Sequence, residues 1–269
     1  MRLRPTAVLL VLAASGAHAQ AVDTVTHDKT FLTRRDLGVS AVALAGTALL
    51  SRWDRDIAVA SQTSKYQGSG LKSFASKVSK VQETTLTLSG ILAYGIGRLT
   101  KQQTLTDVAL HATESVVLAS VASQVIRGPL GRARPYVTGD TDQYDFKFMS
   151  GFKTGDQGFQ RRAFPSIHTS SSMAVATVLT MEMHRRHVAA TPYVAPLLFA
   201  AGLLPGLARI QLNQHWASDV AAGAFMGVFA GYKVVSYSHD HPNNAFDRTL
   251  LKMTVSPSPQ GGLQLGLSY

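Results

Sequence analysis

Three short segments of the sequence combine side chains that bind phosphate with side chains that move protons. Guanidinium groups hold phosphate oxygens in a fixed, two-pronged geometry. Histidine acts as a nucleophile, or as an acid and base, near neutral pH. The candidate site residues are Arg127 and Arg134, then Ser166, Ile167 and His168, and finally Arg209, His215 and Asp219. Together these residue types predict chemistry on a phosphate group.

His215 and Asp219 are a candidate nucleophile and its partner. They are four positions apart, so on a helix they share one face. A carboxylate bonded to one ring nitrogen fixes the tautomer and leaves the other nitrogen free to attack. Arg209, six positions before His215, adds a permanent positive charge. Taken alone, the pair is also typical of an ordinary helix surface.

Ser166 lies between Pro165 and a helical run, which makes it a candidate N-cap. The N–H groups of a first helical turn have no intrahelical partner, and the positive end of the helix dipole favours an anion there. His168 belongs to this turn and is a candidate proton donor. Taken alone, the segment is better explained by a capping serine beside an ordinary histidine.

Arg127 and Arg134 are seven positions apart, and two helical turns would bring them to roughly one side. Pro129 and Pro135 predict that the helix ends near these residues. We interpret Arg132, which lies between them, as a solvated charge at the helix end.

Together, the three segments resemble the superfamily of type 2 phosphatidic acid phosphatases, bacterial non-specific acid phosphatases and vanadium haloperoxidases. Its signature is Lys-x6-Arg-Pro, then Pro-Ser-Gly-His, then Ser-Arg-x5-His-x3-Asp. The chain matches it with Arg127-x6-Arg134-Pro135, Pro165-Ser166-Ile167-His168 and Ala208-Arg209-x5-His215-x3-Asp219. Arginine replaces lysine, isoleucine replaces glycine and alanine replaces serine, but every proposed nucleophile and proton donor is kept. The side chain of Ile167 is expected to narrow the phosphate pocket.

The resemblance implies a metal-independent phosphatase that hydrolyses phosphate monoesters or diphosphates through a phosphohistidine. In that mechanism His215 attacks phosphorus, Asp219 aligns it, and His168 protonates the leaving oxygen. The implied substrate is a phosphorylated lipid or a soluble phosphate ester, and no cofactor is expected. A vanadate-dependent haloperoxidase and a non-catalytic phospholipid-binding envelope protein are the alternatives.

The remaining histidines are not expected to bind a metal. We interpret His184 and His187 as a solvated helix end, and His239 to His241 as a polar connector. The absence of cysteine excludes cysteine–zinc sites and thiol catalysis. The formal net charge of +10 indicates an anionic partner. Nucleic acid is disfavoured, because the basic residues are scattered and no patch with interleaved aromatics is present.

The elements that must position these residues are mainly helices. Six apolar runs predict an all-α bundle of about six core helices: 37–50, 84–99, 107–126, 170–183, 193–207 and 220–235. An amphipathic surface helix is expected over 70–81, and a long functional loop over 136–163. Alternating residues over 250–269 predict a short C-terminal β-hairpin. The runs favour a packed bundle, with a membrane surface as a possible partner, and leave membrane spanning open.

The first nineteen residues have the pattern of a secretory signal peptide. Arg2 and Arg4 precede a short apolar run, and Ala17 and Ala19 suit cleavage before Gln20. The run is too short to cross a bilayer as a helix, although an uncleaved anchor is the alternative. We therefore expect an exported, periplasmic or envelope protein with a signal peptide at 1–19, a helical phosphatase domain at 20–249 and the hairpin extension at 250–269.

Overall fold

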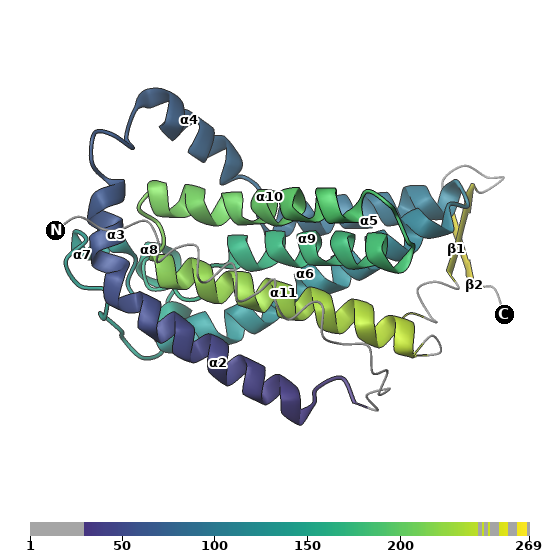
Figure 1. Ribbon diagram of the computed structural model, residues 1–269, viewed down its shortest axis with the longest axis horizontal. Coiled ribbons are helices and arrows are strands. Elements are labelled where there is room, and N and C mark those ends of the chain that lie inside the picture. Colours follow the sequence, from purple (N-terminus) through teal and green to yellow (C-terminus); the bar gives the residue numbers. More distant parts are fainter. Residues whose placement is uncertain (1–29, 242–243, 245–246, 248–252, 258–262, 268–269) are drawn as a thin grey trace. The chain divides into compact units, whose positions relative to one another are not determined.

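The structure of the protein is a computed structural model, in which residues 30–241, 244, 247, 253–257 and 263–267 are described (Figure 1). Contacts divide the chain into Met1–Phe31 and Leu32–Tyr269, and every described helix and strand belongs to the second unit. The expected signal peptide and its cleavage before Gln20 lie outside the described residues. The expected domain boundaries stay predictions.

The described part of the chain is built from helices, as the sequence predicts. All six predicted core helices are present, and most extend a few residues beyond the apolar runs. The core helices are α2 (Arg34–Leu50), α5 (Glu83–Leu99), α6 (Gln103–Leu130), α9 (Ile167–Arg185), α10 (Thr191–Gln211) and α11 (Ala217–Asp240). The amphipathic surface helix is also present, as α4 (Ser69–Val78). The sequence patterns did not predict η1 (Ser51–Trp53) and α3 (Asp54–Ser61).

Helix α9 is the central element of the bundle. It packs against α6, α10 and α11, which run alongside it (Figure 1). Its buried positions are mostly small, among them Ser170, Ala174 and Ala176. Small side chains allow neighbouring helices to approach closely on several sides at once. The ends of these four helices are therefore held in fixed positions relative to one another.

Glycines on α11 permit the closest of these contacts. Gly223, Gly227 and Gly231 recur every four residues and so share one face. A Cβ at Gly227 would collide with the backbone oxygen of Ser170 on α9. Backbone-to-backbone packing of this kind fixes the start of α11 against the start of α9.

The long loop over 136–163 is present, but it contains short helices that the sequence did not predict. These are α7 (Pro135–Thr138), η2 (Ser150–Phe152) and α8 (Gly155–Phe159). The loop begins after Gly131, which ends α6 in the left-handed region with φ of 59°. A Cβ there would meet the backbone oxygen of Lys147. Only glycine suits both conditions, so this turn directs the loop back over the helix ends.

Two strands, β1 (Met253–Pro257) and β2 (Leu263–Leu267), pair antiparallel with Met253 opposite Leu267. Residues 258–262, which would form the turn between them, lie outside the described residues. The hairpin therefore stays a prediction, and it contributes nothing to the candidate site.

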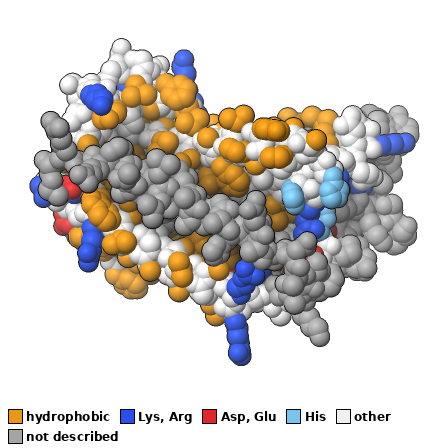
Figure 2. Space-filling model, viewed as in Figure 1, with side chains coloured by type: hydrophobic (Ala, Val, Ile, Leu, Met, Phe, Trp, Pro, Cys, Tyr) orange, Lys and Arg blue, Asp and Glu red, His pale blue; other side chains and the backbone are white. Residues whose placement is uncertain are grey.

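The face of the protein drawn in Figure 2 carries many apolar side chains. Val42 on α2, Leu92 on α5 and Tyr193 on α10 are 75%, 65% and 79% exposed. Among the described residues, three helices are long and apolar enough to cross a membrane: α6, α10 and α11. Only 22% of the most apolar stretch of α10 is buried within the protein. This distribution is typical of a protein that contacts lipid.

Candidate active site

The eight candidate residues come together where four helices and their connectors meet. Arg127 lies in the last turn of α6, His168 in the first turn of α9, and Arg209 in the last turn of α10. The ring centroids of His168 and His215 are 6.4 Å apart. Arg134 Nη1 lies 3.5 Å from His215 Nε2. Residues separated by as many as 92 positions in the sequence thus form one cluster.

His215 is placed by the turn that joins α10 to α11. Asn213 adopts a left-handed conformation with φ of 59°, and His215 N–H donates to the backbone oxygen of Arg209 over 3.3 Å. The side chain of His215 is fully enclosed. Its Nδ1 atom lies 3.4 Å from Asp219 Oδ2 but makes no hydrogen bond with a described residue, so the expected bond between ring and carboxylate is a close contact only. Its Nε2 atom faces Arg134 Nη1.

Asp219 is held rigidly by groups other than His215. Its Oδ2 accepts from the backbone N–H of Trp216 over 2.8 Å, and its Oδ1 accepts from Arg132 Nη1 over 2.5 Å. Arg132 also donates to Asp54 Oδ2 over 2.8 Å and to Ser218 Oγ over 2.8 Å. This network fixes the carboxylate beside the ring of His215.

The interpretation of Arg132 as a solvated charge is wrong. Only 2% of its surface is exposed, and it lies between two buried carboxylates, those of Asp54 and Asp219. Asp54 comes from α3, which the sequence patterns did not predict. No spacing rule connects a carboxylate at 54 to a guanidinium at 132, so only the tertiary structure reveals this pair.

Arg127, Arg134 and Arg209 form a cationic cluster around the two histidines. Arg134 is fixed by backbone oxygens: its Nε donates to Phe159 and its Nη1 to Gln214, both over 2.9 Å. None of the three arginines forms an ion pair with a described residue, in contrast to Arg132. In addition, the Nε atoms of Arg127 and Arg209 are buried without a hydrogen-bond acceptor among the described residues. Buried positive charge of this kind favours an anion.

Burial and the cationic cluster together lower the pKa of both histidines. Burial, and then the charges of Arg209 and the other cluster members, lowers the pKa of His168 from 6.5 to about 2. Burial and Arg134 likewise hold the pKa of His215 well below its usual value. Burial and neighbouring guanidiniums lower the pKa of Arg134 to about 9, which still leaves it charged at pH 7. Both imidazoles are therefore neutral at physiological pH, and the site repels metal cations.

Ser166 is the N-cap of α9, as expected, and Ile167 is the first helical residue. The Ser166 hydroxyl accepts a hydrogen bond from Thr169 Oγ1 over 3.0 Å. The backbone N–H of Ser166 donates to the backbone oxygen of Asp219 over 3.0 Å. Because Ile167 has a helical backbone, its position does not require the conformational freedom of glycine. The first turn of α9 supplies the N–H groups that anions prefer.

The site has a closed end and an open end. His215 is 1% exposed, Arg134 is 2% exposed and Arg127 is 7% exposed, whereas His168 and Arg209 are only partly buried. His215, at the closed end, faces the guanidinium of Arg134. His168, at the open end, can contact a leaving group that departs toward solvent. This arrangement suits a nucleophile and a proton donor on different sides of one anion.

Comparison with known proteins gives consistent results. The family model described as the PAP2 superfamily matches residues 108–242. A lipid A 1-phosphatase of Porphyromonas gingivalis is 34% identical over 74 residues, which are 28% of this chain and 16% of that protein. A lipid A 1-phosphatase of Rhizobium etli is 25% identical over 132 residues, 49% of this chain and 51% of that protein. The chain thus spans about half or less of the length of these relatives.

A solved structure shares the fold. It is the crystal structure of a transmembrane PAP2 type phosphatidylglycerolphosphate phosphatase from Bacillus subtilis, with a TM-score of 0.53 and 16% sequence identity. The match covers 77% of this chain and 98% of that one. At this identity the similarity establishes the fold alone.

Proposed function

The chain belongs to the PAP2 superfamily, and from this membership and the geometry of the site we propose that it is a membrane-associated phosphatase of phosphorylated lipids. The observation that carries the proposal is the cationic cluster, whose three guanidiniums form no ion pair with a described residue and lie around a neutral, buried His215. The carboxylate of Glu83 is near enough to raise the pKa of Arg127 and Arg209 against the effect of burial, but it pairs with neither. A phosphate dianion is the ligand that such a site favours. The lipid A 1-phosphatases among the relatives support the same class of reaction.

In the first step, His215 Nε2 attacks phosphorus and the P–O bond to the leaving group breaks. The lone pair is available because His215 is neutral, and the Asp219 carboxylate stabilises the imidazolium that forms. The cationic cluster and the N–H groups of α9 stabilise the charge on the non-bridging oxygens. The product of this step is a phosphohistidine and a free alcohol.

His168 transfers the protons. A bound dianion next to the ring favours its charged form, so substrate binding raises the pKa that the arginines have lowered. The protonated ring then donates to the leaving oxygen, and the neutral ring accepts a proton from the water that hydrolyses the phosphohistidine. The partly exposed position of His168 suits contact with both the leaving group and water.

A lipid substrate is supported by the exterior of the bundle as well as by the relatives. Helices α6, α10 and α11 have the length and composition to cross a membrane. At 1.5 Å per residue, the 21 residues of α10 extend about 31 Å, close to the hydrocarbon thickness of a bilayer. The N-terminal pattern supports export, with the active site serving a lipid of the cell envelope.

Phosphate release from three substrates tests the proposal. We expect the detergent-solubilised protein to hydrolyse a lipid A-type phosphate or phosphatidylglycerolphosphate faster than a soluble aryl phosphate, with inhibition by vanadate. His215→Ala should lower turnover by about 10⁴-fold or more, whereas His184→Ala, at an exposed position outside the site, should not. Halide oxidation that requires vanadate would instead identify a haloperoxidase. Lipid binding without any turnover would identify a non-catalytic protein.

A further inference from the structure

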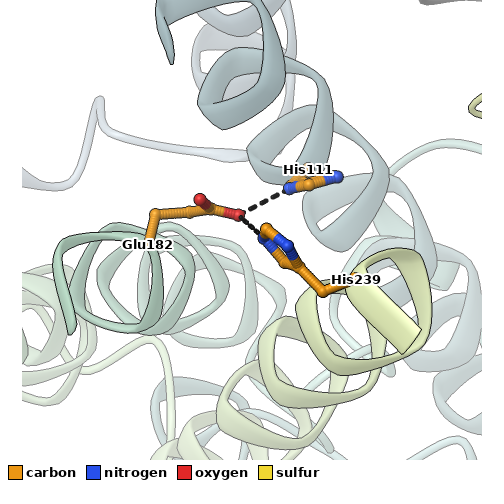
Figure 3. Close-up of side chains that lie close together, drawn as sticks. All are labelled: His111, Glu182 and His239. Atoms are coloured by element: carbon orange, nitrogen blue, oxygen red, sulfur yellow. Dashed lines mark hydrogen bonds and ion pairs between the residues drawn. The ribbon is translucent and has the colours of Figure 1, made fainter. Parts of the chain in front are cut away.

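A second cluster of chemically active side chains lies at the other end of the bundle. His111 on α6, Glu182 in the last turn of α9 and His239 in the last turn of α11 meet there (Figure 3). His111 precedes Arg127 by 16 residues on the same helix, which is about 24 Å along its axis. The proposed phosphatase mechanism uses none of these three residues. We call them the His–Glu–His cluster.

The two imidazoles converge on one carboxylate oxygen. His111 Nδ1 lies 2.7 Å from Glu182 Oε1, and His239 Nε2 lies 2.9 Å from the same atom (Figure 3). The three ligand atoms all lie within 4.8 Å of one another. The two rings are held edge to face, with centroids 5.5 Å apart. Two ring nitrogens from two helices thus face one carboxylate oxygen from a third helix.

Glu182 and His111 are buried, so their contact is not an ordinary polar contact on the protein surface. Glu182 is 1% exposed and His111 is 4% exposed. The second oxygen, Glu182 Oε2, is 3.3 Å from Arg186 Nη2 but makes no hydrogen bond with a described residue. Arg186 is itself paired with Asp107, which lowers its net repulsion toward a cation. Oε2 is therefore available as a further metal ligand.

We propose that the His–Glu–His cluster binds one divalent transition-metal ion of the zinc type. Imidazole nitrogen and carboxylate oxygen are ligands that zinc prefers, at about 2.0–2.2 Å, which places neighbouring ligand atoms about 3.3 Å apart in a tetrahedron. The observed N···O separations need to open by only about half an ångström to reach that value. To bind the ion, each neutral ring carries its one proton on the nitrogen that faces away from Glu182, which leaves His111 Nδ1 and His239 Nε2 free as ligands. Water or Oε2 completes the coordination.

The ion would have a structural role and would stabilise the folded protein. Each ligand comes from a different helix, so the metal would join α6, α9 and α11 at the end that lies away from the candidate active site. Binding energy of a site that exists only in the folded chain stabilises that chain. The other reading of the same contacts is a hydrogen-bonded polar cluster that holds the helices together without metal.

Metal binding by the full-length, tag-free protein in detergent distinguishes the two readings. After treatment with chelator and its removal, we expect one Co²⁺ to bind per chain, with the visible absorption of tetrahedral cobalt, and Zn²⁺ to displace it. Glu182→Gln should weaken binding by at least about 100-fold, since even partners outside the coordination sphere are worth 10–100-fold. His239→Ala, at a partly exposed helix end, provides a second variant that is easier to fold. His184→Ala, two residues from Glu182 but exposed, is the matched control and should bind normally.

Two results would overturn the proposal. The first is a folded wild-type protein that binds neither Co²⁺ nor Zn²⁺ at one ion per chain, which would leave only the hydrogen-bonded cluster. The second is metal binding that persists in both Glu182→Gln and His239→Ala, which would place the ion elsewhere.

Discussion

At the scale of single residues, the protonation of His168 decides how the site works. Burial, together with the arginines that attract a phosphate, lowers the pKa of His168 to about 2, so in the proposed mechanism the free protein holds this ring without the proton that the leaving group needs. A bound phosphate supplies the opposite charge and favours the imidazolium. In the proposed mechanism, substrate binding therefore causes the protonation that makes His168 a proton donor.

This coupling predicts proton uptake on binding. Because the pKa of His168 is depressed in the free protein, the ring is unprotonated at pH 8, and binding of inorganic phosphate as a dianion should draw in up to one proton. Titration calorimetry in two buffers of different ionisation enthalpy measures this number. His168→Ala should abolish most of the uptake, and His184→Ala should not. Equal heats in both buffers for the wild-type protein would contradict the coupling.

Ile167 occupies the position of the signature glycine, and its replacement should be tolerated by the chemistry. In Ile167→Gly the backbone N–H is retained and the pocket widens, so we expect turnover to persist and the range of accepted substrates to broaden. Ile167 is 3% exposed, so the variant should lose about 2–5 kcal/mol of stability. Rates are therefore compared per folded molecule, against Ile167→Val. A folded but inactive glycine variant would mean that Ile167 has a different role.

At the scale of elements, a buried ionic network attaches α3 to the start of α11. Arg132 bridges Asp54, the first residue of α3, and Asp219, in the first turn of α11. Ser218 reinforces the bridge, since its N–H and hydroxyl both donate to Asp54. The network orients the carboxylate that faces His215, so in the proposed mechanism Arg132 is a positioning residue.

Breaking this network should cost both stability and rate. Arg132→Gln leaves two buried carboxylates without their cation, and removal of one partner from a buried pair typically costs about 3–5 kcal/mol. The free energy of unfolding from denaturant titration, with kcat for lipid and aryl substrates, measures the two effects. Arg161→Gln is the matched control, because its pair with Asp145 is partly exposed and is expected to contribute less than about 1 kcal/mol. Similar losses of unfolding free energy and kcat in the two variants would show that the Arg132 network contributes no more than an exposed ion pair.

The sequence predicts the helices and the candidate site better than it predicts the contacts that support them. The core helices are readable because long apolar runs end at prolines, glycines and caps. The eight candidate residues are readable because their spacing follows a signature. The pairing of Asp54 with Arg132 cannot be predicted from the sequence, because 78 positions separate the two residues and no motif links them.

The cluster at the far end of the bundle was missed for the same reason. The interpretation of His239 as part of a polar connector is wrong, because α11 continues to Asp240 and His239 pairs with Glu182. Glu182 and His111 carry no motif. The three residues come together only because α9 and α11 run parallel to each other and α6 runs antiparallel to both.

At the scale of the whole bundle, the proposed phosphate site and the proposed metal site lie apart. The cationic cluster lies where α6 ends and α9 begins, and the His–Glu–His cluster lies toward the opposite ends of the same helices. Three positive side chains occupy the place that a divalent cation would take in many phosphoryl-transfer enzymes. A metal at the distant cluster can therefore affect stability without taking part in catalysis.

Chelation should separate these two effects. With EDTA, at a temperature well below the unfolding transition, we expect phosphate release to continue at an unchanged rate. Differential scanning fluorimetry of the same sample should show a lower Tm, which Zn²⁺ restores. Loss of turnover in EDTA with recovery on addition of Mg²⁺ or Zn²⁺, while the protein stays folded, would count against the metal-independent mechanism.

The central claim is that His215 carries the phosphoryl group while His168 handles the protons. Rapid-quench analysis with a labelled aryl phosphate tests it most directly, because nitrophenolate leaves without a proton. In His168→Ala the second step lacks its base, so an acid-labile phosphoenzyme should accumulate as a burst. The same variant should lose about 10²–10⁴-fold in rate with alkyl esters and less with aryl esters. His215→Ala should form no phosphoenzyme with any substrate. An acid-labile phosphoenzyme that persists in His215→Ala, or equal losses for alkyl and aryl esters in His168→Ala, would contradict the assignment.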